Sequence, residues 1–259
     1  MLKQKPHVLV LSGLDPSGGA GIQADIQAVT ALGCHPLPIV TCLTEQDTVN
    51  VHGAECVDAQ LIRRQLMHLR RDIPIHAVKT GAMGGAEVVG VLREFLDEGP
   101  ALPLVVDPVI KAAGGGELAD EALLQAMKHH LFPLANTLTP NGPELIQLGN
   151  GADEASSAQR LLETGCASVL ATGGHGTGSH IENRLFRADG SEEGWQLERV
   201  GGEYHGSGCT LAAGISAGLA SGYELSESIE QAQSFVARAI DAALRVGSGQ
   251  PVPDRSVRP

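Results

Sequence analysis

The alternation of short apolar runs with helical patterns is the feature that most constrains the fold of this chain. Residues 8–11 and 104–106 are continuously apolar, which predicts strands buried on both faces. Residues 22–32 and 88–96 carry apolar side chains at helical spacing. Strands and helices that alternate in this way predict an α/β fold, in which helices cover both faces of a mainly parallel sheet.

The second half of the chain departs from this alternation. Residues 185–187 and 195–197, each with two apolar side chains, flank a stretch with the pair Asp189-Gly190, which predicts an antiparallel hairpin at an edge of the sheet. A last long helix is predicted over about 225–245, and residues 247–259, rich in glycine, proline and charge, predict a loose tail. A chain of 259 residues without a repeat or a central linker is expected to form one domain, over residues 1–246.

The chain is acidic, with 30 Asp and Glu against 18 Lys and Arg and a net charge of −12. Such a charge repels the phosphates of nucleic acids and anionic lipids, so we expect no nucleic acid and no membrane as a partner. No apolar run reaches the length of a membrane span. The five cysteines include no Cys-x-x-Cys pair, which disfavours a disulfide framework or a zinc knuckle and favours a reducing compartment, the cytoplasm.

Ligands of open α/β sheets bind beyond the carboxyl ends of the strands, where this chain has unusual loops. The first loop, residues 13–21, has three glycines in its last four positions and contains Asp15. It lacks the Lys-Ser/Thr of a Walker A loop and the spacing of a dinucleotide fingerprint. Glycine lets a backbone approach a ligand closely, so a binding loop is favoured over an ordinary turn between strand and helix.

A second loop, Gly206-Ser207-Gly208-Cys209, opens a helix of small apolar residues. The N-terminus of such a helix presents free N–H groups and the positive end of the helix dipole. It therefore suits an anion, in particular the charge that develops on a phosphoryl group during its transfer. We expect the pKa of a Cys209 thiol in this place to be depressed, so that it could act as a base; the alternative is a buried cysteine that serves only as a small hydrophobic side chain.

A third loop follows the short strand predicted at 136–139. Asn141 and Glu144 offer two oxygen ligands there, and Asp107 at another strand end offers a further carboxylate. Mg²⁺ prefers such oxygen ligands. The alternative is a helix N-cap at Asn141 that Glu144 completes as a capping box. Lys79 also stands near a strand end, and we interpret it as solvated.

A series of motifs, in the same order along the chain, resembles the hydroxymethylpyrimidine/phosphomethylpyrimidine kinases of thiamine biosynthesis, a family of the ribokinase-like superfamily. The resemblance spans residue 8 to about residue 245; its first and last motifs are specific, and the middle ones are shared across the superfamily. The motifs are residues 13–25, 40–48, 79–83, 107–109, 139–141 with Glu144, 173–175 and 206–211.

The resemblance implies a three-layer α/β/α sandwich with a mostly parallel central sheet. It also implies ATP-dependent phosphorylation of the hydroxymethyl group of 4-amino-5-hydroxymethyl-2-methylpyrimidine, and then of the resulting monophosphate. ATP and Mg²⁺ are the implied cofactors, and a homodimer is the implied assembly. The alternative activity is that of a pyridoxal kinase of the same superfamily. A further alternative is a protein of this fold that binds a ligand without catalysing a reaction.

The resemblance also implies roles for individual residues. Cys209 matches the position of the catalytic base, and Gly206, Ser207 and Gly208 would form the anion hole with it. Positions that surround the pyrimidine are matched by Gly13, Asp25, Gln46, Met83 and Val109. ATP and phosphate positions are matched by Asn141, Thr172, Gly174 and Thr210, and metal positions by Asp107 and Glu144. Thr172 stands where the family often has a lysine, and Ser207 where it usually has a threonine.

Overall fold

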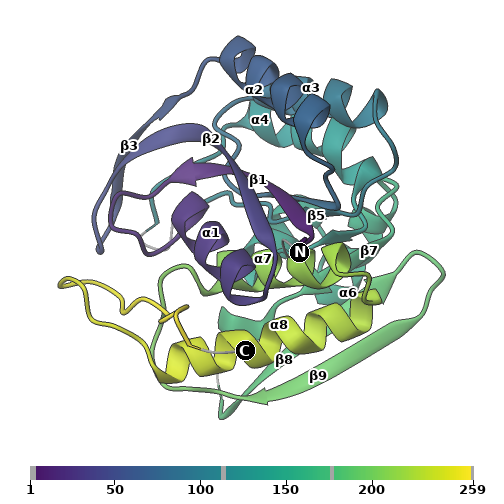
Figure 1. Ribbon diagram of the computed structural model, residues 1–259. Helices are drawn as coiled ribbons and strands as arrows, with labels where there is room; N and C mark the ends of the chain where they lie inside the picture. Colours follow the sequence, from purple (N-terminus) through teal and green to yellow (C-terminus); the bar gives the residue numbers. More distant parts are fainter. Residues whose placement is uncertain (1–3, 112–114, 176–177, 258–259) are drawn as a thin grey trace.

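The computed structural model describes residues 4–111, 115–175 and 178–257 (Figure 1). In these residues the strands form one nine-stranded sheet in the order β3-β2-β1-β4-β5-β6-β7-β8-β9. The six central strands are parallel, and both edges are antiparallel. The strands are β1 (His7–Leu14), β2 (His35–Gln46), β3 (Val51–Cys56), β4 (Ala77–Thr80), β5 (Leu104–Val106), β6 (Thr137–Leu138), β7 (Ser168–Ala171), β8 (His180–Arg187) and β9 (Glu192–Glu198).

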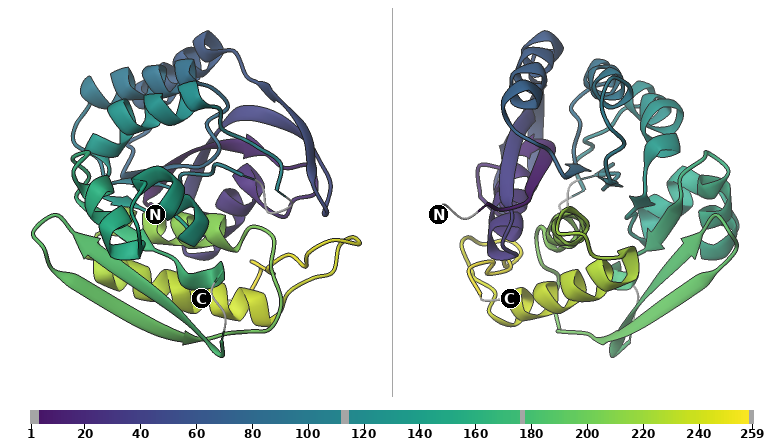
Figure 2. Two further views of the ribbon diagram at one scale, coloured as in Figure 1. Left: turned by 180° about the vertical axis from the view of Figure 1, so that it is seen from behind. Right: turned by 45° about the vertical axis from the view of Figure 1, so that its right-hand side comes forward.

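Helices cover both faces of the sheet, which confirms the three-layer α/β fold (Figures 1 and 2). One face packs against α1 (Gly21–Ala31), α7 (Ser207–Ala220) and α8 (Leu225–Asp241). The other packs against α2 (Ala59–Asp72), α3 (Ala86–Asp97), α4 (Glu121–Ala126), α5 (Gly142–Gly149) and α6 (Glu154–Leu162). Single turns complete the list: η1 (Met127–Leu131), η2 (Phe132–Leu134) and η3 (Gly173–His175).

Strand β1 shows why the apolar runs are continuous. Val8 and Val10 point into the core beneath α1 and α7, whereas Leu9 and Leu11 point into the core beneath α2 and α3. Successive side chains of a strand alternate between the faces, so a strand covered on both faces needs apolar residues at every position.

Within the described residues, no helix combines the length and apolarity needed to cross a membrane.

The edges of the sheet agree with the sequence in part. The predicted hairpin is confirmed as β8 and β9. A second antiparallel pair, β2 with β3, was not predicted because residues 44–56 are mostly polar and largely solvent-exposed. Helix α6, which is short, was not predicted, and the start of α5 was offered only as the alternative interpretation of Asn141 and Glu144.

The prediction of a loose tail is wrong for the part of it that the structure describes. Helix α8 ends at Asp241, and the chain then turns back so that Leu244 and Val252 pair as an antiparallel bridge. Arg255 is 3% exposed. Glycine and proline suggested disorder, but neighbouring loops satisfy the backbone of this segment by hydrogen bonds from distant parts of the chain. That residues 1–246 form a single domain stays a prediction.

Candidate active site

The candidate site lies where the carboxyl ends of the central parallel strands meet the N-terminus of α7. Strands β1, β4 and β5 are neighbours in the sheet, and α7 packs against all three. Loop 13–21 follows β1, Lys79 belongs to β4, and Asp107 comes directly after β5. Strand topology therefore brings together residues that are far apart in the sequence, as expected for the ligand-binding edge of an open α/β sheet.

The N-terminus of α7 is built to receive an anion. Gly206 caps the helix in the left-handed conformation, with φ of 83°, and offers no side chain to the first N–H groups. A Cβ atom on Gly206 would collide with the carbonyl oxygen of Gly19, whereas a Cβ on Gly208 would meet open space. The first turn of α7 therefore keeps its free N–H groups and the positive end of the dipole, which suit an anion; that residues 206–209 form an anion hole stays a prediction.

The predicted depressed pKa of Cys209 is wrong. Burial raises the pKa of the thiol to about 12, and the carboxylate of Asp107 adds to this rise, against the ammonium group of Lys79. The helix N-terminus favours a thiolate, but desolvation and a nearby negative charge outweigh it. Both opposing effects come from tertiary structure, so the local sequence did not reveal them.

Lys79 is fully buried, so the interpretation of this lysine as solvated is wrong. Its Nζ atom lies 2.8 Å from Oδ1 of Asp25 and 3.9 Å from Oδ2 of Asp107. Burial disfavours the ammonium ion, yet the carboxylate of Asp25 and the other acidic neighbours outweigh it and raise the pKa of Lys79. Among the described residues, Oδ2 of Asp25 and Oδ2 of Asp107 have no hydrogen-bond partner. One buried cation thus holds two carboxylates beneath the anion site, and each keeps an unused oxygen.

The loop after β6 forms the capping box that the sequence offered as an alternative. The amide of Glu144 donates to Oδ1 of Asn141 at 2.9 Å, and Oε2 of Glu144 accepts from the amide of Asn141 at 3.0 Å. Oε1 of Glu144 faces the amide of Ile110 at 3.4 Å. Burial and the nearby Asp107 raise the pKa of Glu144 to about 8. Glu144 therefore stabilises the start of α5, whatever further ligand it binds.

The same residues fit a magnesium ion bound together with phosphate. Within the described chain, no group of three or more His, Cys, Asp and Glu side chains gathers as a metal site. Mg²⁺, however, commonly uses only one or two carboxylates and completes its shell with phosphate and water. Asp107, with its unused oxygen, and Glu144, close enough to feel its charge, are such a pair.

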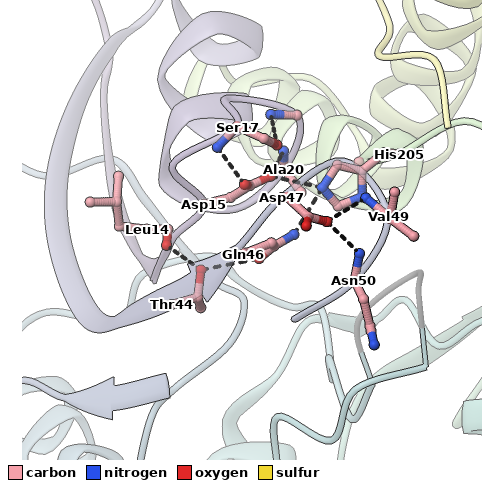
Figure 3. Close-up of polar contacts among 12 residues, drawn as sticks. Leu14, Asp15, Ser17, Ala20, Thr44, Gln46, Asp47, Val49, Asn50 and His205 are labelled. Atoms are coloured by element: carbon pink, nitrogen blue, oxygen red, sulfur yellow. Dashed lines mark hydrogen bonds and ion pairs between the residues drawn. The ribbon is translucent and has the colours of Figure 1, made fainter. Parts of the chain in front are cut away.

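One hydrogen-bonded network connects loop 13–21, the end of β2 and the residue before the start of α7 (Figure 3). Nε2 of His205 lies 2.7 Å from Oδ2 of Asp15 and 3.0 Å from the side-chain amide of Gln46. The amides of Ser17 and Ala20 donate to the two oxygens of Asp15, at 2.8 and 2.9 Å. Burial disfavours the carboxylate, but hydrogen bonds from His205 and Ser17 outweigh it and lower the pKa of Asp15.

These contacts fix the orientation of the Gln46 amide. An ionised Asp15 accepts a proton from Nε2 of His205, so that nitrogen cannot also accept one from Gln46. The structure places Nε2 of Gln46 3.0 Å from His205 and Oε1 3.1 Å from Oγ1 of Thr44. Exchanging these two amide atoms turns the oxygen to His205 and the nitrogen to Thr44, which resolves the conflict. Thr44 in turn donates to the carbonyl oxygen of Leu14 at 2.8 Å. In this arrangement Nε2–H of His205, the hydroxyl of Thr44 and one N–H of Gln46 each face an acceptor, and the second N–H of Gln46 stays free.

The other residues predicted around the pyrimidine differ in accessibility. Gly13 lies at the end of β1, where a Cβ atom would press on the thiol of Cys42. Val109 is half-buried after β5. Met83 is 1% exposed and packs in the core beneath α2 and α3. Asp25 is fully buried and forms an ion pair with Lys79. Of these, the structure leaves Gln46 and Val109 partly open to a ligand.

The predicted nucleotide residues fall into two groups. Asn141 and Thr172 form a parallel bridge, and Gly174 follows in the next turn, so these three lie together. Thr210 is fully buried, and its hydroxyl donates to the carbonyl oxygen of Gly206 at 2.7 Å. Oγ1 of Thr210 also accepts from Nε of Arg255 at 2.7 Å. Protein partners therefore occupy the hydroxyl of Thr210.

Sequence reasoning missed several residues of this site. Arg199 donates to the carbonyl oxygens of Gly173 and Gly174, beside the position where the family often has a lysine. His205, which directly precedes Gly206, was not singled out as a site residue. A lysine inside a fully buried four-residue strand was a usable signal for Lys79. Composition gave no signal for Arg255, because its partners lie up to 236 positions away.

Comparisons with known proteins agree with this geometry. A family model described as phosphomethylpyrimidine kinase matches residues 15–253. A hydroxymethylpyrimidine/phosphomethylpyrimidine kinase of Streptomyces coelicolor is 36% identical over 251 residues, covering 94% of this chain and 92% of the relative. Bacillus subtilis pyridoxal kinase in complex with ADP superposes with a TM-score of 0.88 at 27% identity, covering 98% of both chains. A phosphomethylpyrimidine kinase from Clostridium difficile 630 superposes with a TM-score of 0.78 at 31% identity, covering 91% of this chain and 100% of the other. The chain belongs to the phosphomethylpyrimidine kinase family.

Proposed function

We propose that the chain transfers the γ-phosphoryl group of ATP to the hydroxymethyl group of 4-amino-5-hydroxymethyl-2-methylpyrimidine, and then phosphorylates the monophosphate to the diphosphate. It is a hydroxymethylpyrimidine/phosphomethylpyrimidine kinase of thiamine biosynthesis. The observation that carries this proposal is the uncapped N-terminus of α7, with Cys209 in its first turn and Gly208 facing open space.

Phosphoryl transfer depends mainly on positioning and on neutralising charge, and the α7 terminus supplies both. The N–H groups of Ser207, Gly208 and Cys209 would hold the oxygens of the transferring group. Cys209 would accept the proton of the substrate hydroxyl through its minor thiolate form, which Lys79 favours against the larger effect of burial. Mg²⁺ held by Asp107 and Glu144 would neutralise phosphate charge.

Gln46 is suited to reading an aminopyrimidine. In the orientation fixed by the network, its oxygen keeps one lone pair and its nitrogen one N–H. An aminopyrimidine edge presents an amino donor beside a ring nitrogen acceptor, the complement of that pair. Val109, half-buried beside the site, would contact the ring. This assigns pyrimidine selection to Gln46 and phosphoryl transfer to α7.

Pyridoxal phosphorylation is the second candidate activity, because the pyridoxal kinase of Bacillus subtilis shares the fold so closely. The purified chain with ATP and Mg²⁺ separates the two. We expect kcat/KM for the hydroxymethylpyrimidine to exceed that for pyridoxal. Turnover of pyridoxal alone would favour the second activity, and turnover of neither would contradict both.

Assembly and location stay predictions. A homodimer follows from the family resemblance, and a cytoplasmic location from the five cysteines, which are all unpaired in the structure. Light scattering on the protein as it elutes from a size-exclusion column would give the molar mass of the assembly directly. A mass near 26.9 kDa at assay concentration would contradict the dimer.

A further inference from the structure

One side chain of the C-terminal segment reaches the floor of the candidate site. Nη2 of Arg255 donates to the carbonyl oxygen of Gly19 at 2.6 Å and lies 3.3 Å from that of Gly206. Nε of the same guanidinium donates to Oγ1 of Thr210 at 2.7 Å, and Nη1 lies 3.3 Å from the side-chain oxygen of Gln27. A single planar group thus joins loop 13–21 to the first turn of α7.

The segment that carries Arg255 is itself fastened to the site loops. The amide of Gln250 donates to the carbonyl oxygen of Thr48 at 3.2 Å, at the turn between β2 and β3. The amide of His205 donates to the carbonyl oxygen of Pro251 at 2.9 Å. Val252 would touch a Cβ atom placed on Gly19. The backbone of residues 250–252 therefore fixes the place at which the guanidinium of Arg255 lies between loop 13–21 and α7.

The charge of Arg255 is unusual for a buried arginine. The side chain is 3% exposed, yet in the described residues no carboxylate lies within 4.0 Å of the guanidinium. Its near partners are carbonyl, amide and hydroxyl oxygens, and the carboxylates of Asp25, Asp15 and Asp254 favour its charge only from beyond contact distance. A buried cation without an ion-pair partner is costly to fold. Its position at the α7 N-terminus adds positive potential where an anion would bind.

We propose that Arg255 is a positioning residue of the phosphoryl transfer, acting through the anion hole. Its guanidinium holds the carbonyl oxygens of Gly19 and Gly206 together, so that the first N–H groups of α7 keep one geometry while charge develops on the transferring group. This rests on the proposed kinase function, but not on which acceptor is phosphorylated.

The first test is steady-state kinetics of Arg255→Ala and Arg255→Lys in the full chain. We expect kcat of Arg255→Ala to fall by ~10- to 100-fold, with KM for ATP and for the pyrimidine changed less than about threefold, because the lost interaction matters most in the transition state. Arg255→Lys keeps the positive charge but not the planar guanidinium, so its kcat should lie between those of the wild type and Arg255→Ala. Guanidinium chloride far below its denaturing range should restore part of the activity of Arg255→Ala. Arg245→Ala is the matched control, since Arg245 is exposed in the same part of the chain.

The second test needs no acceptor. ADP with aluminium fluoride imitates the transferring phosphoryl group, and its affinity relative to ADP alone reports the anion hole. Isothermal titration should show that Arg255→Ala loses about tenfold or more of that preference while ADP binding is retained. An unchanged preference, or an unchanged kcat per folded molecule with only a lower melting temperature, would overturn the proposal. If the wild type turned over pyridoxal and not the pyrimidine, the proposed function would fail while both tests remained decisive with pyridoxal.

Discussion

Nε2 of His205 lies 2.7 Å from a carboxylate oxygen of Asp15, and this contact ties the loop after β1 to the residue before the α7 anion hole. Both side chains are nearly fully buried. The pair fixes the proton on Nε2 and thereby turns the amide of Gln46. A contact between two loops thus sets the hydrogen-bonding pattern of a third residue, Gln46, to which we assign the pyrimidine.

The network predicts coupled effects of Asp15 and His205 on substrate binding. Asp15→Asn and His205→Ala should each raise KM for the pyrimidine by ~10-fold and leave KM for ATP nearly unchanged, because each releases Gln46. The double variant should cost little more than either single one, since both act through one network. Steady-state kinetics on the four proteins measure this, and additive losses would contradict it.

Glu144 predicts an unusual dependence of stability on pH. Its pKa rises from 4.5 in the unfolded chain to about 8 in the folded one. Between these values the folded state holds a proton that the unfolded state has lost, so stability falls as pH rises from about 4.5 through 8. Glu144→Gln removes this penalty and keeps a capping-box oxygen. Thermal melts without Mg²⁺ should show the variant gaining on the wild type between pH 5 and 8 while its kinase activity drops; a constant difference would rule this out.

The buried ion pair of Lys79 with Asp25 predicts a large loss of stability when the lysine side chain loses its charge. Lys79→Met should cost about 3–5 kcal/mol, because it leaves the carboxylate of Asp25 buried without its ion-pair partner. Adding Asp25→Asn should recover part of that loss. Lys111→Ala, at an exposed lysine, should stay within about 0.5 kcal/mol of the wild type. Urea unfolding measures all three, and equal costs for Lys79 and Lys111 would refute the buried pair.

Two glycines test the close approach at the anion hole. Gly206 and Gly222 have similar left-handed φ angles, 83° and 87°, but a Cβ atom meets the carbonyl oxygen of Gly19 only at Gly206. Gly222→Ala should therefore cost only the left-handed strain, about 1–2 kcal/mol, with kcat retained. Gly206→Ala should cost more and lose most of the activity. Similar kcat values for both variants would contradict this.

Cys209 predicts an alkaline rise in rate. A thiol with a pKa near 12 is mostly protonated at neutral pH, so the thiolate fraction grows with each pH unit below that value. The kcat of the wild type should climb from pH 7 to 9, whereas Cys209→Ala should be slower by ~10²–10⁴-fold and lack this dependence. An undiminished rate in Cys209→Ala would show that the base lies elsewhere.

The sequence predicted what depends on local pattern. Apolar runs predicted β1 and β5, and the glycines at 206 and 208 predicted the uncapped N-terminus of α7. It did not predict properties set by contacts between distant segments. The pKa of Cys209 has the opposite sign because burial and Asp107 outweigh the helix dipole. Arg255 belonged to a segment whose composition suggested disorder, and only the fold shows that it joins Gly19 to α7.

The central claim is that the hydroxymethyl group of the pyrimidine sits at Cys209 while its amino edge meets Gln46. A crystal structure of the chain with the pyrimidine bound tests this most directly. We predict the hydroxymethyl oxygen within hydrogen-bond distance of Sγ of Cys209, and the amino group and a ring nitrogen on the side-chain amide of Gln46. A ring bound away from Gln46, or a hydroxymethyl group directed away from the N-terminus of α7, would contradict the account.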